Sequence, residues 1–334
     1  MTRTLREGVD ALRGCHIALI GDFILDEYIY GDTVRVSREA PVPVILRKST
    51  EHRLGGAANT VRSLVALGAR VSICGTLGAD EAGATVRGLL QELPGVEAQF
   101  VERSGATTVK TRVLAGAFGT AKQQILRLDS EPSVSLAPKT AASLIEEVRA
   151  LAKEADGLIV SDYGLGDINE TVRGALKGIL PSVPSFIDSR FHLNAFDGAK
   201  AVTPNLPEAE ALVGFQIQTP DDVNRAGAKL LERLGVDAVL LTQGRGGMSL
   251  FRAEMPVEHV EITGEEEVTD VTGAGDTVMA TFALGAVSGI GMVNAMRLSN
   301  VAAGVVVNKL GASTCSSDEL LFAGESCGLE LQPW

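Results

Sequence analysis

Short apolar runs alternate with amphipathic stretches along most of this chain. Two stretches, 56–68 and 137–157, repeat apolar residues at helical spacing. Apolar strands that alternate with amphipathic helices predict a doubly wound α/β domain, in which helices cover both faces of a mostly parallel sheet. Ligands bind such sheets beyond the carboxyl ends of the strands, where this chain carries Asp22, Asn205 and Thr242. The strand-like runs that end in polar or turn residues are 16–22, 71–78, 158–164, 185–190, 199–205 and 237–244.

Two segments break this rhythm. Residues about 28–53 and about 97–128 favour strands and turns over helices, and each lies between strand–helix units. We expect them to form a small antiparallel sheet that projects from the core as a discontinuous lid. No linker or change of composition divides the chain, so residues 1–334 are predicted to be a single domain.

The composition narrows the classes of function. The chain has 334 residues, with 30 Lys and Arg against 42 Asp and Glu, and this formal net charge of −12 argues against sequence-independent nucleic-acid binding. An anionic small molecule remains possible, because a few local cations can outweigh the global sign. The four cysteines are scattered, as in a reduced cytoplasmic protein. The uncharged stretch 277–296 is rich in Ala and Gly, so we interpret it as two buried helices rather than as a membrane span.

One glycine-rich motif stands directly before an apolar helical run. Residues 270–277 read Asp-Val-Thr-Gly-Ala-Gly-Asp-Thr. A helix that starts at 274–276 would direct the amides of Gly273, Ala274 and Gly275 outward, where the helix dipole favours an anion. From this motif alone, Asp276 is as well explained by a favourable acid in the first helical turn.

Three further stretches carry small and polar residues where a loop meets a helix or a strand. Each is a weak signal alone, because helix caps and hairpin turns use the same residue types. They are 53–60 with its glycine pair and Asn59, the pair Asn205 and Glu208, and the turn with Thr242, Gly244 and Gly247.

In this order and at these spacings, the motifs resemble those of the ribokinase-like (PfkB) carbohydrate kinases. The resemblance runs from about Cys15 to about Ser317. Residues 55–59 (Gly-Gly-Ala-Ala-Asn) are similar to the family's N-terminal signature, and 270–281 match its C-terminal signature at every defining position. The resemblance implies a doubly wound α/β domain with a β lid, and an enzyme that binds ATP, magnesium and a sugar.

The resemblance also implies roles for individual residues. Asp276 would be the catalytic base that takes the proton from the sugar hydroxyl, and residues 273–275 would form the anion hole around the phosphoryl group. Asn205 and Glu208 would hold magnesium, largely through water. The other implied contacts are the nucleotide phosphates at Thr242, Gly244 and Gly247, the adenine beside Asn300, the sugar hydroxyls at Asp22, Gly55, Gly56 and Asn59, and potassium near Asp270 and Gly311.

A narrower resemblance concerns the substrate. Residues 21–45 contain Gly-Asp-x-x-Leu-Asp and then Ser-x-Glu-Ala-Pro-Val-Pro-Val, and resemble the start of bacterial D-glycero-β-D-manno-heptose 7-phosphate kinases. Lys110 and Arg112 lie two apart on a predicted strand and so face one side, which suits a substrate phosphate, with Arg127 as a third cation. The alternative is that these cations are solvated strand residues or dimer contacts.

The chain also departs from that pattern. Arg38 stands where those kinases usually have proline, and residues 188–190 read Asp-Ser-Arg instead of Asp-Pro-Lys, which leaves the exact sugar open. Asp162 is explained as well by a capped turn as by a substrate contact. No nucleotidyltransferase motif follows the kinase motifs, so the stand-alone kinase form is expected.

We therefore expect a cytoplasmic ATP- and magnesium-dependent kinase that phosphorylates the anomeric hydroxyl of heptose 7-phosphate, as a homodimer formed through the lid. Open alternatives are a kinase of the same family for another sugar or sugar phosphate, and a non-catalytic sensor on the same fold. Neither nucleic acid nor membrane is an expected partner. A dinucleotide oxidoreductase is excluded, because residues 21–27 lack the required glycine fingerprint after the first strand.

Overall fold

A large sheet forms the centre of the molecule. The computed structural model describes residues 4–117, 120–132, 135–263, 269–309 and 311–334. The strands of this sheet are β1 (His16–Gly21), β4 (Arg70–Gly78), β5 (Val96–Arg103), β8 (Gly157–Asp162), β9 (Ser185–Ser189), β10 (Ala201–Val202), β11 (Ala238–Thr242), β12 (Met248–Arg252) and β13 (Glu258–Val260). Among the described residues they follow the order β13-β12-β11-β10-β9-β8-β1-β4-β5. The strands from β11 to β5 run parallel, and β12 and β13 add an antiparallel edge.

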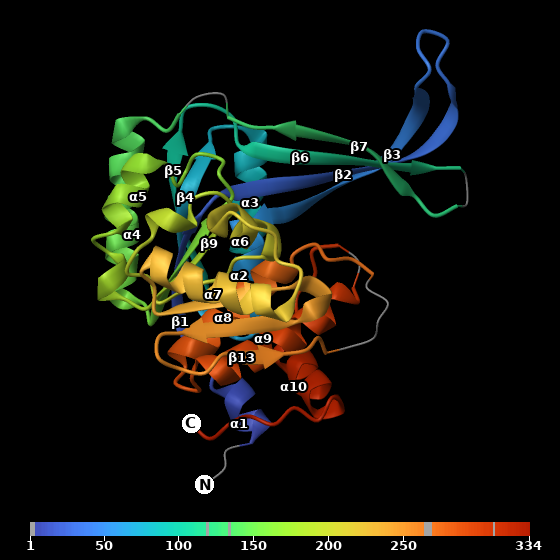
Figure 1. The fold of residues 1–334 in the computed structure, drawn as a ribbon. Coiled ribbons are helices and arrows are strands. Elements are labelled where there is room, and N and C mark those ends of the chain that lie inside the picture. Colours follow the sequence, from blue (N-terminus) through green and yellow to red (C-terminus); the bar gives the residue numbers. More distant parts are fainter. Residues whose placement is uncertain (1–3, 118–119, 133–134, 264–268, 310) are drawn as a thin grey trace.

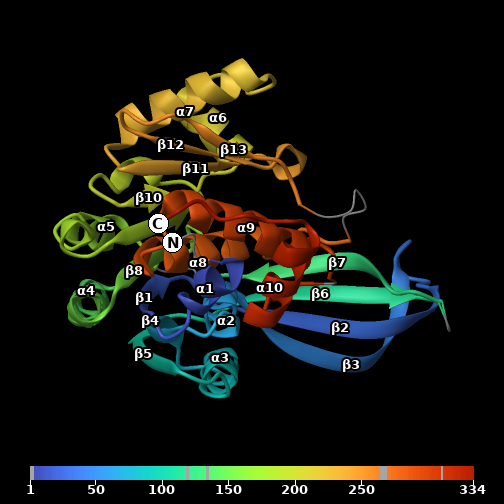
Figure 2. The same cartoon turned by 90° about the horizontal axis from the view of Figure 1, so that it is seen from below.

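Both faces of this sheet are buried, which explains why its strands read as nearly continuous apolar runs. In β1, Ile17 and Leu19 enter one hydrophobic core, whereas Ala18 and Ile20 enter the other. Figure 2 shows α4 and α5 on one side of β1 and β8, with α8 and α9 on the other. The first core is covered by α1 (Leu5–Asp10), α2 (Ala57–Ala66), α3 (Glu81–Gln91), α8 (Ala274–Val287), α9 (Met292–Val307) and α10 (Ser317–Ser326); the second by α4 (Pro138–Glu154), α5 (Glu170–Leu176), α6 (Leu206–Val213) and α7 (Pro220–Leu234). The predicted doubly wound α/β architecture is confirmed.

The uncharged stretch 277–296 lies within α8 and the start of α9. Nearly every residue of α8 from Asp276 to Gly285 is buried, and α8 packs closely along α9. No helix among the described residues is long and apolar enough to cross a membrane.

A second sheet projects from this body as a long ribbon (Figure 1). Its strands are β2 (Phe23–Val36), β3 (Pro43–Gly56), β6 (Thr108–Gly116) and β7 (Gln123–Ser130), in the order β3-β2-β6-β7. We call this four-stranded sheet the lid. β2 and β3 correspond to the first segment that was expected to form the lid, and β6 and β7 to most of the second. Two details of the prediction need correction.

The first correction concerns the direction of the strands. β2 pairs with β6 in parallel, so the lid is a mixed sheet rather than an antiparallel one. The second concerns its boundary, because residues 96–103 form β5, which pairs in parallel with β4 at the edge of the large sheet. An edge strand exposes alternate residues, and its polar alternation therefore resembles that of the lid strands in the sequence. Residues 118–119 lie outside the described residues.

Candidate active site

Two cavities meet at the carboxyl ends of the central strands. The smaller, of about 290 Å³, lies between the ends of β8 and β9 and the starts of α6 and α8. The larger, of about 780 Å³, extends along α9 toward the turn between β11 and β12. The two cavities share Asn205, Thr242, Gly275 and Val278 in their walls, so molecules bound in them would meet there.

The N-terminus of α8 opens into the smaller cavity. Gly273 is the N-cap of α8 and has a φ of 80°, in the left-handed region that favours glycine. Within the described part of the chain, the amides of Gly273 and Gly275 have no hydrogen-bond partner, and a β-carbon on Gly275 would meet nothing within 4 Å. The amide of Ala274 differs, because it donates to the carbonyl of Val271 at 3.2 Å. Two of the three amides expected to hold an anion are therefore available.

Asp276 lies in the first turn of α8, at the wall of the same cavity, and its side chain is 5% exposed. The hydroxyl of Tyr163 donates to Asp276 Oδ1 at 2.8 Å, and the hydroxyl of Thr60 donates to the same oxygen at 3.1 Å. Burial raises the pKa of Asp276 to about 6, although hydrogen bonds from Tyr163, Thr60 and Asn59 oppose this rise. Asp276 is therefore an oriented carboxylate that is mostly ionised at neutral pH.

One face of the lid carries the predicted cations and lies beside this cavity. The Lys110 ammonium stands 5.7 Å from the centre of the Tyr163 ring, so Lys110 is close to the cavity wall. Arg112 Nη1 bonds to Asp26 Oδ1 at 2.7 Å, and both side chains are largely buried. Burial, and next the nearby Arg127, lower the pKa of Lys110.

Arg127 lies on β7, directly opposite Arg112 in the pairing of β6 with β7. Its guanidinium already forms two bonds with Asp129, of 2.7 and 2.6 Å. The structure therefore brings all three cations to one face, and Lys110 contacts the cavity wall through Tyr163. Arg38 lies in the turn between β2 and β3, at the far end of the lid.

The carboxylate of Asp22 bonds to backbone amides in this structure, and its predicted contact with the sugar stays a prediction. Asp22 is 2% exposed, and its carboxylate accepts hydrogen bonds from the amides of Tyr163 at 2.8 Å, Leu165 at 3.2 Å and Asp167 at 3.2 Å. Burial, followed by the charge of Asp167, raises the pKa of Asp22 to about 7. Asp22 thus fixes the loop after β8 and does not line the cavity.

The glycine pair at the end of β3 is close to the site. A β-carbon on Gly55 would lie 2.7 Å from a carboxylate oxygen of Asp26, so only glycine fits beside that side chain. Gly56 is the N-cap of α2, with a φ of 58°. Asn59, in the first turn of α2, is 8% exposed, and its Oδ1 has no hydrogen-bond partner within the described residues. Since buried polar atoms rarely lack partners, Asn59 is a strong candidate for a ligand contact.

Asn205 and Glu208 form the cap of α6. Asn205 Oδ1 accepts from the Glu208 amide, and Glu208 Oε2 accepts from the Asn205 amide, each at 3.0 Å. Glu208 shares the cavity with Asp188, whose pKa is raised well above its usual range by burial and then by the charge of Asp276. Arg190 lines the same wall.

Asp162 also lies in this wall. Its carboxylate accepts from the Gly164 amide at 2.9 Å and the Ser189 hydroxyl at 2.7 Å, as in a capped turn.

The turn between β11 and β12 borders the larger cavity. Thr242 donates its amide to the Pro204 carbonyl at 2.9 Å, which fixes the end of β11 beside the start of α6. Gly244 and Gly247 have φ values of 56° and 74°, and a side chain on Gly247 would collide with the Val260 carbonyl. Asn300 lies on α9 at the opposite wall and donates to the Glu261 carbonyl at 2.6 Å.

The predicted potassium position lies at the edge of this region. Asp270 accepts from the amides of Thr272 at 2.9 Å and Gly311 at 3.0 Å. The amides of Thr269 and Asp270 both donate to the Val307 carbonyl at 3.0 Å. The structure therefore brings Asp270 and Gly311 together. Residue 310, which directly precedes Gly311, lies outside the described residues.

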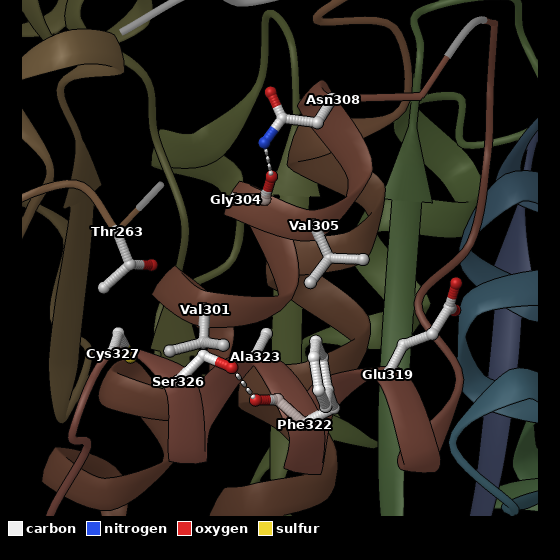
Figure 3. Close-up of a pocket in the computed structure, with 10 residues that line it drawn as sticks. All are labelled: Thr263, Val301, Gly304, Val305, Asn308, Glu319, Phe322, Ala323, Ser326 and Cys327. Atoms are coloured by element: carbon white, nitrogen blue, oxygen red, sulfur yellow. Dashed lines mark hydrogen bonds between the residues drawn. The ribbon is translucent and has the colours of Figure 1, made fainter. Parts of the chain in front are cut away.

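Another hollow, of about 700 Å³, lies between α9 and α10 (Figure 3). It shares Thr263, Gly304 and Asn308 with the larger cavity, and Phe322 and Cys327 line it from α10 and the residue after it. Gly304 packs directly against the Thr263 carbonyl, so this contact forms the wall between the two spaces.

Three side chains of the site were not assigned from the sequence. Tyr163 and Thr60 bond to Asp276, and Asp26 pairs with Arg112. Asp26 is the last residue of the Gly-Asp-x-x-Leu-Asp pattern, which could have suggested a role in the site. In the structure it lies directly opposite Lys110 in the pairing of β2 with β6. Thr60 and Tyr163 carried no separate signal, because their proximity to Asp276 depends on tertiary contacts.

Comparisons with known proteins agree with this geometry. The model of the pfkB family of carbohydrate kinases matches residues 16–319. The Bifunctional protein HldE of Citrifermentans bemidjiense is 40% identical over 307 residues, which cover 91% of this chain and 62% of that protein. The HldE of Rhodospirillum rubrum is 36% identical over 326 residues, or 96% of this chain and 64% of that protein. This chain thus spans less than two thirds of the length of these relatives.

Solved structures share the fold at low sequence identity. Phosphofructokinase-2 from Escherichia coli in complex with potassium gives a TM-score of 0.78 at 18% identity, covering 94% of this chain and 99% of that one. Ribokinase from Arabidopsis thaliana complexed with ribose and ATP gives a TM-score of 0.68 at 21% identity, covering 93% and 98%. The chain therefore belongs to the pfkB family of carbohydrate kinases and has a ribokinase-like fold.

Proposed function

We propose that this kinase transfers the γ-phosphoryl group of ATP to the anomeric hydroxyl of D-glycero-D-manno-heptose 7-phosphate, forming the 1,7-bisphosphate. Such a step would supply a precursor of ADP-heptose for lipopolysaccharide synthesis in the cytoplasm. The observation that carries the proposal is the pair of Lys110 and Arg112 on the lid face beside the Asp276 cavity. The relatives named Bifunctional protein HldE, and the resemblance of residues 21–45 to heptose 7-phosphate kinases, support the choice of sugar.

The two cavities suit the two substrates. ATP would occupy the larger one, with its adenine beside Asn300 and its phosphates over the turn from Thr242 to Gly247. The sugar would lie between Asp276 and the lid, with a hydroxyl on the unpartnered Oδ1 of Asn59 and its phosphate against Lys110 and Arg112. The γ-phosphate then reaches Gly275, which both cavities share.

The chemistry follows from this placement. Asp276 accepts the proton of the attacking hydroxyl, while the amides of Gly273 and Gly275 bond to the oxygens of the phosphoryl group as it moves. These amides are held by the start of α8, so they stabilise the developing charge without reorganisation. Positioning and charge neutralisation dominate phosphoryl transfer, because its transition state is loose.

The oxygen-rich wall of the smaller cavity fits a magnesium ion. Glu208 and Asn205 present carboxylate and amide oxygens, and Asp188 adds a second carboxyl group. Within the described residues, no three His, Cys, Asp or Glu side chains converge to coordinate a metal directly, and magnesium usually keeps several of its waters. We therefore place magnesium beside Asn205 and Glu208 with water between, where it would neutralise phosphate charge. Potassium would lie near Asp270 and Gly311, beside the start of α8.

The lid is proposed to form a homodimer. Its strands expose large apolar side chains that no other described residue covers, including Leu46 at 54%, Leu126 at 48% and Leu128 at 55%. Leu126 and Leu128 alternate with Arg127, so they lie on the face opposite the cations. An exposed apolar patch of this kind on a projecting sheet suits a second copy of the same lid. Light scattering should give a dimer mass for the wild type and a monomer mass for Leu128→Glu; an unchanged mass would contradict this assembly.

Substrate identity is tested by measuring ADP release with a panel of sugars. Heptose 7-phosphate should give the highest kcat/KM, and Lys110→Met should lower kcat/KM for this sugar phosphate without weakening ATP binding. Faster turnover of ribose or fructose would assign the chain to another sugar of the same family. ADP release with none of the sugars, despite normal ATP binding, would favour a sensor.

A further inference from the structure

Tyr163 connects the wall of the cavity to Asp276. It directly follows β8, and its hydroxyl donates to Asp276 Oδ1 at 2.8 Å. Thr60 donates to the same oxygen at 3.1 Å. Both hydroxyl donors fall on Oδ1, and the Asn59 side chain also hydrogen-bonds to the carboxylate. These contacts fix the orientation of the carboxylate.

Tyr163 is itself held by a buried carboxylate. The Tyr163 amide donates to Asp22 Oδ2 at 2.8 Å, and the amides of Leu165 and Asp167 bond to the two oxygens of the same carboxylate. Asp167 in turn accepts from the Thr76 amide at 3.0 Å, so the loop is fixed to β4 as well as to β1. This network fixes the backbone from which the Tyr163 ring reaches Asp276.

We propose that Tyr163 is a positioning residue for Asp276, which orients the carboxylate and stabilises its ionised form, and that Asp22 acts through Tyr163. This inference rests on the proposed role of Asp276 as the base. A hydrogen bond donated to a carboxylate favours its charged form, so removal of the Tyr163 hydroxyl should make Asp276 harder to ionise. The hydroxyl contributes to catalysis only through Asp276 and transfers no proton to or from the substrate.

Other charges also face this pair and set its background. Asp26 from β2 and Asp188 from β9 each repel the Asp276 carboxylate, and the Lys110 ammonium from β6 lies over the Tyr163 ring. Asp188 is itself repelled by the carboxylates of Glu208 from α6 and Asp162 from β8. The positive charge of Arg190 stabilises the ionised form of Glu208. None of these groups is altered by Tyr163→Phe, so the substitution isolates the hydroxyl.

The test is the pH dependence of kcat/KM for Tyr163→Phe, because kcat/KM reports the ionisation of the free enzyme. One hydrogen bond to a charged group corresponds to a shift of about one pH unit, so the acidic limb should move upward from about pH 6 to about pH 7. On that shift, kcat/KM would fall about fivefold at pH 6 and little at pH 8. Tyr30→Phe is the matched control, because Tyr30 bonds only weakly to Glu51 on the exposed lid and should leave the limb unchanged.

The outcomes separate this inference from the proposed function. If Asp276→Asn retains turnover, the role of Asp276 fails first. If Asp276→Asn is inactive but Tyr163→Phe shows the wild-type limb, or loses the same fraction of kcat/KM at every pH, Tyr163 does not act on the ionisation of Asp276. Replacement of Tyr163 by 3,5-difluorotyrosine, which keeps the ring and donates more strongly, should move the limb to lower pH. An upward or absent shift in that variant would overturn the inference even if Tyr163→Phe folds poorly.

Discussion

The ion pair between Arg112 and Asp26 predicts that substitutions can change the stability of the fold and the affinity for the sugar phosphate independently. The bond is 2.7 Å long, and the two side chains are only 16% and 7% exposed. Substitution Arg112→Met keeps much of the side-chain volume but leaves the Asp26 carboxylate buried without its partner. Breaking a buried ion pair in this way costs about 3 kcal/mol of unfolding free energy at the low end of measured cases. For a chain of this size, that cost lowers Tm by about 4 °C.

The double variant Asp26→Asn with Arg112→Met removes both charges, so most of that stability should return. The affinity for the sugar phosphate should not return, because a charge-assisted bond to phosphate is lost in both variants, at about 10- to 100-fold in kcat/KM. Thermal unfolding and steady-state kinetics measure the two effects separately. Equal Tm values for the single and double variants would refute the ion-pair reasoning, and an unchanged kcat/KM in Arg112→Met would refute the phosphate contact.

Three further predictions concern the start of α8, the nucleotide turn and the base. Gly275→Ala should leave Tm unchanged or raise it, because the added β-carbon meets open space and Ala favours helices. Its turnover should nevertheless fall, because that space is where the phosphoryl group passes. An unchanged kcat would contradict this role. Gly247→Ala should lower Tm and raise KM for ATP, because its φ of 74° and the Val260 carbonyl exclude a side chain; a wild-type Tm would show that the turn relaxes. The kcat/KM of the wild type should fall about tenfold per pH unit below about pH 6, as Asp276 with its pKa of about 6 takes up a proton, with circular dichroism confirming the fold at low pH. A flat profile down to pH 5 would exclude Asp276 as the titrating base.

The sequence predicted the features that depend on local pattern. The start of α8 was expected at 274–276, because small residues precede a long apolar run, and the structure begins this helix at Ala274. The cap formed by Asn205 and Glu208 was likewise visible from their spacing of three. The alternation of β-rich runs and amphipathic helices sufficed for the layered architecture.

Features that depend on distant contacts could not be predicted in the same way. Asp22 was assigned to the sugar, and no local pattern reveals that its oxygens accept hydrogen bonds from amides about 140 residues later in the chain. Tyr163 and Thr60 reach Asp276 from two different elements for the same reason. β5 was assigned to the lid, because an edge strand of the large sheet and a lid strand show the same polar alternation.

The central claim is that Asp276 takes the proton of the sugar hydroxyl as the phosphoryl group passes α8. The substitution Asp276→Asn keeps the shape of the side chain and removes its basicity. We predict that kcat for the sugar phosphate falls by about a hundred- to ten-thousand-fold, while calorimetry shows unchanged ATP affinity. Turnover near the wild-type rate in Asp276→Asn would contradict the claim directly.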